Sequence, residues 1–188
     1  MGIRLVAAAQ YQPVPLALLK TQCHLEASFT AEDATLAVYL AAATDQCQQR
    51  IGRSIMLQTW QLDVDALIGE IWLPWPDVMS LASAQYLDGS GNWQEIDAAT
   101  YGLSDGRVRL VGGAQWPIGP GRFIYTAGYA AGDEATQQAA VPAGIKAWIL
   151  LAAASLYANR EAVATGVAVA ALPDRFADGF LDAHKVYA

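Results

Sequence analysis

The sequence predicts an α+β protein in which a small antiparallel β-meander lies between two helical segments. Apolar residues recur at helical spacing over residues 15–51, and a long apolar helical pattern returns within residues 142–186. Between them, about residues 54–129 alternate with period two and are broken by turn residues. Because helices flank the strands, we expect the two ends of the chain to pack as one helical bundle with the sheet inserted. At 188 residues the chain is long enough to build a hydrophobic core as a single domain.

The first helical segment divides into two helices. Pro15 suits the first turn of a helix, which we expect over residues 15–26. Thr30 is a good N-cap for the second helix, and the acidic residues that follow it suit the positive end of the helix dipole. This helix should run to about Ile51, because Gly52 can take the left-handed conformation that commonly ends a helix.

The middle of the chain reads as six or seven short strands. Alternating apolar and polar residues are separated by turn signals such as "DGSGN" and "DG". Prolines stop the second strand, because a proline cannot serve in a central ladder. The expected strands lie in the stretches "SIMLQTWQLDVD", "GEIWLPWP", "DVMSLASAQYLD", "NWQEI", "TYGLS", "RVRLV" and "GRFIYTAGY".

The second helical segment begins with a loop over residues 130–140, which is small and polar. Pro142 then opens a long apolar helix over residues 143–160. A loop containing Gly166 should follow it. A terminal helix should close the chain, with Phe176, Phe180 and Leu181 as its apolar stripe.

Composition limits the classes of partner. Only 15% of residues are charged, against a usual ~25%. Either the abundance of alanine accounts for this, or much of the surface is buried against other subunits. The net charge of −7 gives no basic footprint for binding DNA or RNA, although an acidic protein can surround DNA without gripping it.

Few residues have the chemistry or spacing of a catalytic or metal site. His24 and His184 have no second ligand at a zinc-binding spacing, so we expect no metal and no cofactor. Cys23 and Cys47 read as small buried residues in a reducing compartment, and a disulfide between the first two helices stays open. An enzyme that uses Cys47 as its nucleophile is a minor alternative.

Neither apolar run in the chain predicts insertion into a membrane. Residues 145–158 form the longest run, which is shorter than the ~20 residues that a transmembrane helix needs and contains Lys146. The run at the N-terminus is too short for the apolar region of a signal peptide. We therefore expect no membrane partner and no export.

The tryptophans invite two interpretations. Five of the six lie in or beside the predicted meander, where aromatic residues commonly pack in a core. Trp72, Trp75 and Trp116 lie next to prolines at strand ends, which makes them better candidates for an interface between subunits. A lectin-like module that binds carbohydrate on its aromatic sheet is the alternative.

An ordered set of short motifs covers nearly the whole chain. Arg50, Gly52 and Arg53 are followed by "QTW" at residues 58–60, and then by "LPWPDVMSL", "YLDGSGNW", "FIYTAGY" and "VPAGIKAWILLAAASLYANRE". This set resembles the head–tail connector (adaptor) proteins of tailed bacteriophages, a family also found in gene transfer agents. Two departures are visible. The second proline of "LPWP" falls one position early, and glutamines replace an acidic residue near the end of the second helix.

The resemblance implies a structural role without a catalytic centre. Such proteins form a ring, usually of twelve copies, beneath the portal protein in the neck of the particle, and they are assembled in the cytoplasm of the bacterial host. The ring extends the DNA channel and contacts a neck or tail-completion protein. Its contacts would be heterologous, so two different faces of each copy must match. The candidate residues for contact with other subunits or partners are Trp72, Trp75, Trp116, Arg50, Arg53, Phe176 and Phe180.

Overall fold

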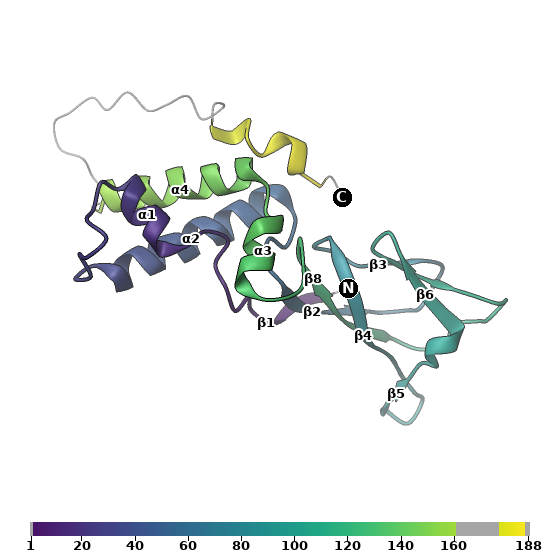
Figure 1. Ribbon diagram of the computed structural model, residues 1–188. Coiled ribbons are helices and arrows are strands. Elements are labelled where there is room, and N and C mark those ends of the chain that lie inside the picture. The colour runs from purple at the N-terminus through teal and green to yellow at the C-terminus, as the bar shows by residue number, and fades with distance from the viewer. Residues whose placement is uncertain (1, 161–176, 187–188) are drawn as a thin grey trace. The chain divides into compact units, whose positions relative to one another are not determined.

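The computed structural model describes residues 2–160 and 177–186, and it confirms the α+β class (Figure 1). The described residues fall into two compact units. One holds the strands and comprises the residues up to Gln10 together with Met56–Ala131, and the other holds the helices and comprises Tyr11–Ile55 and the residues from Gly132 on. The helices are α1 (Leu16–Gln22), α2 (Asp33–Ile51), α3 (Glu134–Ala140) and α4 (Ala143–Ala158). The strands are β1 (Gly2–Ala7), β2 (Gln58–Val64), β3 (Ile71–Trp72), β4 (Val78–Leu87), β5 (Trp93–Glu95), β6 (Tyr101–Ser104), β7 (Arg107–Leu110) and β8 (Gly121–Ala127).

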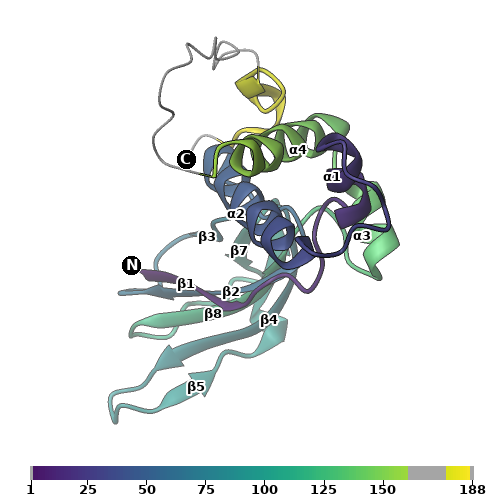
Figure 2. The same ribbon diagram turned by 90° about the vertical axis from the view of Figure 1, so that its left-hand side faces the viewer.

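The strands form two antiparallel sheets. The larger has the order β1-β2-β8-β4-β5, which Figure 2 shows in sequence across the sheet, and the smaller has the order β3-β7-β6. This differs from a simple meander, because β8 lies between β2 and β4 and pairs with both along its length. The chain therefore returns to the centre of the large sheet only after it has built the small one.

The core of the strand unit lies on one face of the large sheet. Every second side chain of β8 points there, and Phe123, Tyr125 and Ala127 are fully buried. Leu62 of β2 and Ala84 of β4 lie directly opposite Phe123 on its two sides, so they share its face. Buried residues of the small sheet, including Ile71 and Val108, complete the same cluster. The other face of the large sheet carries mainly polar side chains.

The helical unit is built around α2 and α4. One side of α2 buries Leu36, Leu40, Cys47 and Ile51, and α4 contributes buried side chains that include Ile149. The predicted end of α2 is confirmed. Gly52 has φ of 66° and donates its backbone N–H to the carbonyl of Gln48.

Several predicted boundaries in the helical unit are wrong. The helix α2 starts at Asp33 rather than after a Thr30 cap, because the backbone first turns with the N–H of Asp33 bonded to the carbonyl of Thr30. Residues 130–140, predicted as a loop, contain α3, which is capped by the Asp133 side chain. At the other end, Ala177 and Asp178 are helical as predicted, but turns and the short 3-10 helix η2 (Asp182–His184) follow, so the predicted terminal helix does not continue through the described residues up to 186. Gly166 and Phe176 lie outside the described residues.

β1 is an element that the sequence analysis did not predict. It pairs antiparallel with β2 from Gly2 opposite Asp63 to Ala7 opposite Thr59, with one irregularity between Leu5 and Ala7. It forms an edge of the large sheet, and all six of its residues are exposed.

Candidate interaction surfaces

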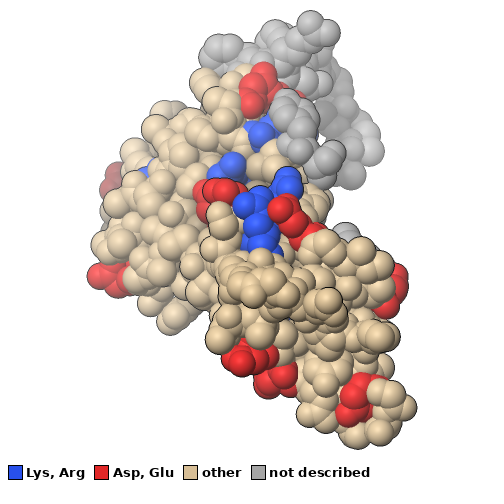
Figure 3. Space-filling model, turned by 90° about the vertical axis from the view of Figure 1, so that its right-hand side faces the viewer, with Lys and Arg blue, Asp and Glu red and all other residues tan. Residues whose placement is uncertain are grey.

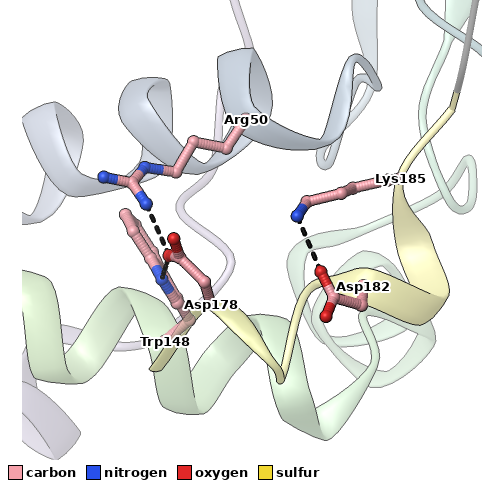
Figure 4. A network of polar contacts seen from close by, with 5 residues as sticks. All are labelled: Arg50, Trp148, Asp178, Asp182 and Lys185. Atoms are coloured by element: carbon pink, nitrogen blue, oxygen red, sulfur yellow. Dashed lines mark hydrogen bonds and ion pairs between the residues drawn. The ribbon is translucent and has the colours of Figure 1, made fainter. Parts of the chain in front are cut away.

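The C-terminal residues 177–186 are held against the helical unit by a polar cluster (Figure 4). The Asp178 carboxylate forms an ion pair with the guanidinium of Arg50, at the end of α2. The indole N–H of Trp148, on α4, donates to the same carboxylate at 3.3 Å. The Arg50 guanidinium also lies over the Trp148 ring, 5.2 Å from its centroid, which adds a cation–π contact. One carboxylate thus ties the end of the chain to two helices.

Packing reinforces this attachment. The backbone N–H of Val186 donates to the carbonyl of Ile51 at 2.8 Å, and the side chain of Leu181 is fully buried. Gly144 gives Phe180 room, because a Cβ at this position would lie 2.9 Å from the Phe180 carbonyl oxygen. We name residues 177–186 the C-terminal strap. Arg50 and Phe180, both predicted interface residues, are part of its attachment, and Arg53 is partly buried directly after α2.

The opposite ends of α2 and α4 are joined by a second cluster. Glu32 accepts hydrogen bonds from the Arg160 guanidinium at 2.8 and 2.6 Å and from the Tyr157 hydroxyl at 2.6 Å. The Arg160 hydrogen bonds, followed by that of Tyr157, hold the pKa of Glu32 below its usual value. The two helices of the core are therefore clamped near both ends.

The tryptophans of the strand unit mostly contact residues of their own chain. Trp75 stacks on Trp60 with ring centroids 5.0 Å apart and planes within 2°. The indole N–H of Trp116 donates to the Gly69 carbonyl at 2.8 Å, and its ring meets Phe123 edge-on. All six tryptophans lie in the described part of the chain, and Trp72 is the most exposed at 38%.

Trp72 lies on an exposed strip of the small sheet. It is directly opposite Arg107 in the β3–β7 pairing. Arg107 and Arg109 both pair with Glu70, at 3.0 and 2.9 Å, and the hydrogen bond from Arg107 is the main cause of the lowered pKa of Glu70. An exposed tryptophan beside arginines is typical of an interface between proteins.

The polar face of the large sheet carries a hydrogen-bonded row across its strands. Arg4 donates to the Gln61 side chain at 2.8 Å, and the Gln61 amide donates in turn to Asp63 at 2.9 Å. Arg122 pairs with Asp63 at 2.8 Å and covers the Trp93 ring, 4.0 Å from its centroid. Burial opposes ionisation of Asp63, but these bonds outweigh it and lower its pKa. The face is therefore polar without a concentration of one charge.

Charged groups are sparse in this protein, because only 15% of its residues are charged. Figure 3 shows one side of the molecule, on which uncharged side chains cover most of the area and charged ones stand in small groups. Large apolar side chains are exposed in both units, among them Ile118 at 96% and Val38 at 65%. Apolar side chains that are exposed singly in this way are common on protein surfaces, so these two do not mark a contact by themselves.

The cysteines have the properties of packing residues. Both are free thiols, so the two are not joined by a disulfide. Cys47 is fully buried, and burial raises the pKa of its thiol to about 12, although nearby Arg50 acts in the opposite direction. A nucleophilic cysteine needs a lowered pKa, so the structure argues against the Cys47 enzyme hypothesis.

The described residues 2–160 and 177–186 contain no group of three or more His, Cys, Asp or Glu side chains placed to hold a metal ion. In the same residues, no single helix is long and apolar enough to cross a membrane. Taken together, α3 and α4 have the length and composition to do so, but they are bent by 102° relative to each other.

Comparison with known proteins shows similarity in structure. No protein-family profile matches the chain, and no curated protein sequence matches it. Its fold is similar to that of a chain in the neck of an empty gene transfer agent (GTA) particle computed with C6 symmetry. That likeness has a TM-score of 0.81 and 22% identity, and it covers 100% of this chain and 97% of the other.

Two further GTA structures contain similar chains. A chain from the virion of a native GTA particle gives a TM-score of 0.78 with 23% identity, over 100% of this chain and 97% of the other. A chain from the neck of a native GTA particle computed with C12 symmetry gives 0.74 with 21% identity and the same coverage. Each of these likenesses thus extends over nearly the whole of the similar chain.

Proposed function

We propose that this protein is a structural head–tail connector (adaptor) subunit in the neck of a phage or phage-like particle. Copies of it form a ring beneath the portal protein, extend the DNA channel and present a surface to a neck or tail-completion protein. The observation that carries the proposal is the likeness over the whole chain to a chain in the neck of a GTA particle.

Features of the chain itself support this role. The net charge of −7 and the scarcity of charged residues suit a protein that contacts its own copies and surrounds DNA without holding it. A ring of identical copies needs two different contact faces on each copy. The exposed strip at Trp72, Arg107 and Arg109 is one candidate for such a face.

The predicted contact residues divide into two groups under this proposal. Trp72 and Arg53 remain candidates for direct contact with another subunit. Arg50 and Phe180 would act through the C-terminal strap, whose position they help to fix. Trp75 and Trp116 would stabilise the strand unit and would not contact another subunit directly, because their rings pack on Trp60 and Phe123.

The lectin-like alternative gains no support from the tryptophans. A carbohydrate platform needs the open face of an aromatic ring, whereas one face of Trp75 and one face of Trp93 are covered by Trp60 and Arg122. Head–tail connection is therefore the one function that we propose.

Electron microscopy of the protein mixed with the portal protein of its own particle tests the proposal. Class averages should show a second ring stacked on the portal ring, with the six- or twelve-fold symmetry expected from the similar particles. The portal alone is the control. A mixture in which this protein stays monomeric and leaves the portal images unchanged would contradict the proposed role.

A further inference from the structure

The edge of the large sheet at β1 is open and apolar. Ile3 and Leu5 are 39% and 44% exposed, and Val6 is 51% exposed. β1 pairs with β2 on one side, and among the described residues no strand pairs with its other side. It carries no proline, and Arg4 is its one charged residue. Proteins usually protect such an edge against pairing with another strand, because its backbone groups are ready to bond.

The exposed side chains of β1 continue the core of the strand unit. Ile3 lies opposite the buried Leu62, and Leu5 lies opposite Trp60, so both point to the face that carries the core. Ile3 and Leu5 are therefore exposed because, among the described residues, no strand lies beyond β1 to cover them. Further into the sheet, the same face is buried. A strand added at this edge would cover them and extend the apolar layer.

The occupant can be argued from the other edge of the same sheet. Beyond β4, the strand β5 pairs only with Gln85–Leu87. The first part of β4, residues 78–83, has no strand on that side among the described residues, and none of its side chains is buried. It is as long as β1. Val78 and Leu81 in it point to the core face, like Ile3 and Leu5.

The directions of the two edges also match. The large sheet is antiparallel throughout, so β1 and β4 run in opposite directions within one copy. A rotation about an axis roughly parallel to the strands preserves these directions. β1 of one copy would then meet β4 of the next in an antiparallel pair, which is the geometry of a heterologous ring contact.

Charge complementarity favours the same pair. Arg4 points to the polar face of β1. Glu95 lies on the polar face at the far edge, where it accepts a hydrogen bond from Ser83 at 3.1 Å. With β1 laid along residues 78–83 of a neighbour, the Arg4 guanidinium would lie within reach of the neighbour's Glu95.

We propose that β1 of one copy adds to the free half of β4 in a second copy of this chain, which joins the large sheets of neighbouring subunits. The inference rests on the proposed ring, for which it names one of the contacts. Ile3 and Leu5 supply the apolar part of this contact, and Arg4 and Glu95 supply its charge pair.

Hydrogen exchange and lysine substitution on the edge strand test the contact. In the full-length protein, those amides of residues 3–6 that point away from β2 should exchange freely at low concentration and become protected when copies associate. The double variant Ile3→Lys, Leu5→Lys should raise the concentration needed for association at least ~tenfold, because charge on an edge blocks strand addition. Val38→Lys and Ile118→Lys are matched controls at exposed apolar positions outside this edge and should change it less than ~twofold.

A charge exchange keeps the test independent of folding. Arg4→Glu and Glu95→Arg should each weaken association by roughly two- to fivefold, as surface ion pairs do, and the double variant should recover most of the loss. If each residue acted only within its own copy, the double variant would not recover the lost association, because Arg4 and Glu95 lie on opposite edges of one sheet and do not meet there. Sedimentation velocity measures the association of all four proteins.

The outcomes separate this inference from the proposed function. Rings on the portal with unprotected β1 amides and unaffected lysine variants would overturn the β1 contact and leave the function intact. Association through protected β1 amides without a portal ring would support the contact and count against the function. A chain that does not associate under either condition overturns both.

Discussion

Gly144 gives a sharp test of how the C-terminal strap is attached. It lies in the first turn of α4, where replacing glycine by alanine normally stabilises a helix by about 0.5–1 kcal/mol. Here the new Cβ would lie 2.9 Å from the carbonyl oxygen of Phe180. Carbon atoms do not approach a backbone oxygen so closely, and the backbone on either side is held, so Gly144→Ala should displace the strap.

The size of the effect follows from what the strap buries. Leu181 is fully buried, and exposing such a side chain costs about 1.5–3 kcal/mol. The exposed Arg50–Asp178 ion pair adds at most about 1 kcal/mol. After the gain in helix propensity, we expect a net loss of about 1–2 kcal/mol, which lowers the melting temperature by about 3–6 °C in a chain of this size.

Hydrogen exchange and thermal unfolding together measure this change. The amide of Val186, which donates to Ile51, should exchange faster in Gly144→Ala while the amides in the middle of α2 stay protected. Gly89→Ala is the control, because a Cβ at Gly89 meets no atom within 4 Å. A Gly144→Ala protein that melts higher than the original, with unchanged exchange at Val186, would show that the strap does not lie against α4 as described.

Three other predictions follow from single contacts. Arg160 lowers the pKa of Glu32 in the folded state, so the contribution of Glu32 to the free energy of unfolding is complete above the unfolded pKa of ~4.3 and is lost as the pH falls through the folded pKa. In urea titrations at several pH values, Glu32→Gln should therefore lose less stability towards low pH than the original protein. With a thiol pKa of about 12, Cys47 should react with iodoacetamide at least ~100-fold more slowly in the native protein than after unfolding, and mass spectrometry locates the label; fast native labelling would contradict its burial. Gly121→Ala brings a Cβ to within 2.3 Å of a Leu67 methyl carbon and should cost about 1–3 kcal/mol in urea unfolding; adding Leu67→Ala should recover part of that loss, and strict additivity of the two losses would contradict the contact.

Local sequence signals predicted most of the elements. Period-two alternation located the strands that became β2 to β8, because most of them have one face on the core. Gly52 marked the end of α2 through its left-handed conformation. The missed helix α3 carried a signal of its own. Asp133 caps it by accepting from the Thr136 amide at 2.9 Å, and alanine and glutamine follow.

Strand order and β1 depended on long-range pairing, which local patterns do not encode. Arg4 of β1 meets Gln61 of β2, 57 residues further along the chain. The stretch around β1 is apolar without alternation, so it resembled the start of a signal peptide more than a strand. The position of β8 between β2 and β4 likewise follows from which apolar faces fit together in the core.

The candidate contact residues show the same limit. Their types pointed to an interface, since tryptophan and arginine are enriched there. Sequence could not show which of them are already engaged within the chain. Arg50 finds its carboxylate at Asp178, 128 residues away, and Trp75 finds the face of Trp60. Trp72 keeps the interface interpretation because its ring lies on an exposed strip.

The pairing of arginines bears directly on how a channel subunit could treat DNA. Holding a phosphate backbone requires cations that are free to replace counterions. In the described residues several arginines already pair with carboxylates of their own chain: Arg50 with Asp178, Arg107 and Arg109 with Glu70, Arg122 with Asp63, and Arg160 with Glu32. Each pair joins separate segments of the chain. The carboxylate also neutralises the positive charge of its arginine, so these arginines add little positive potential to the surface. With a net charge of −7 besides, the chain would suit the proposed channel, because a surface with few unpaired cations lets DNA pass without holding it.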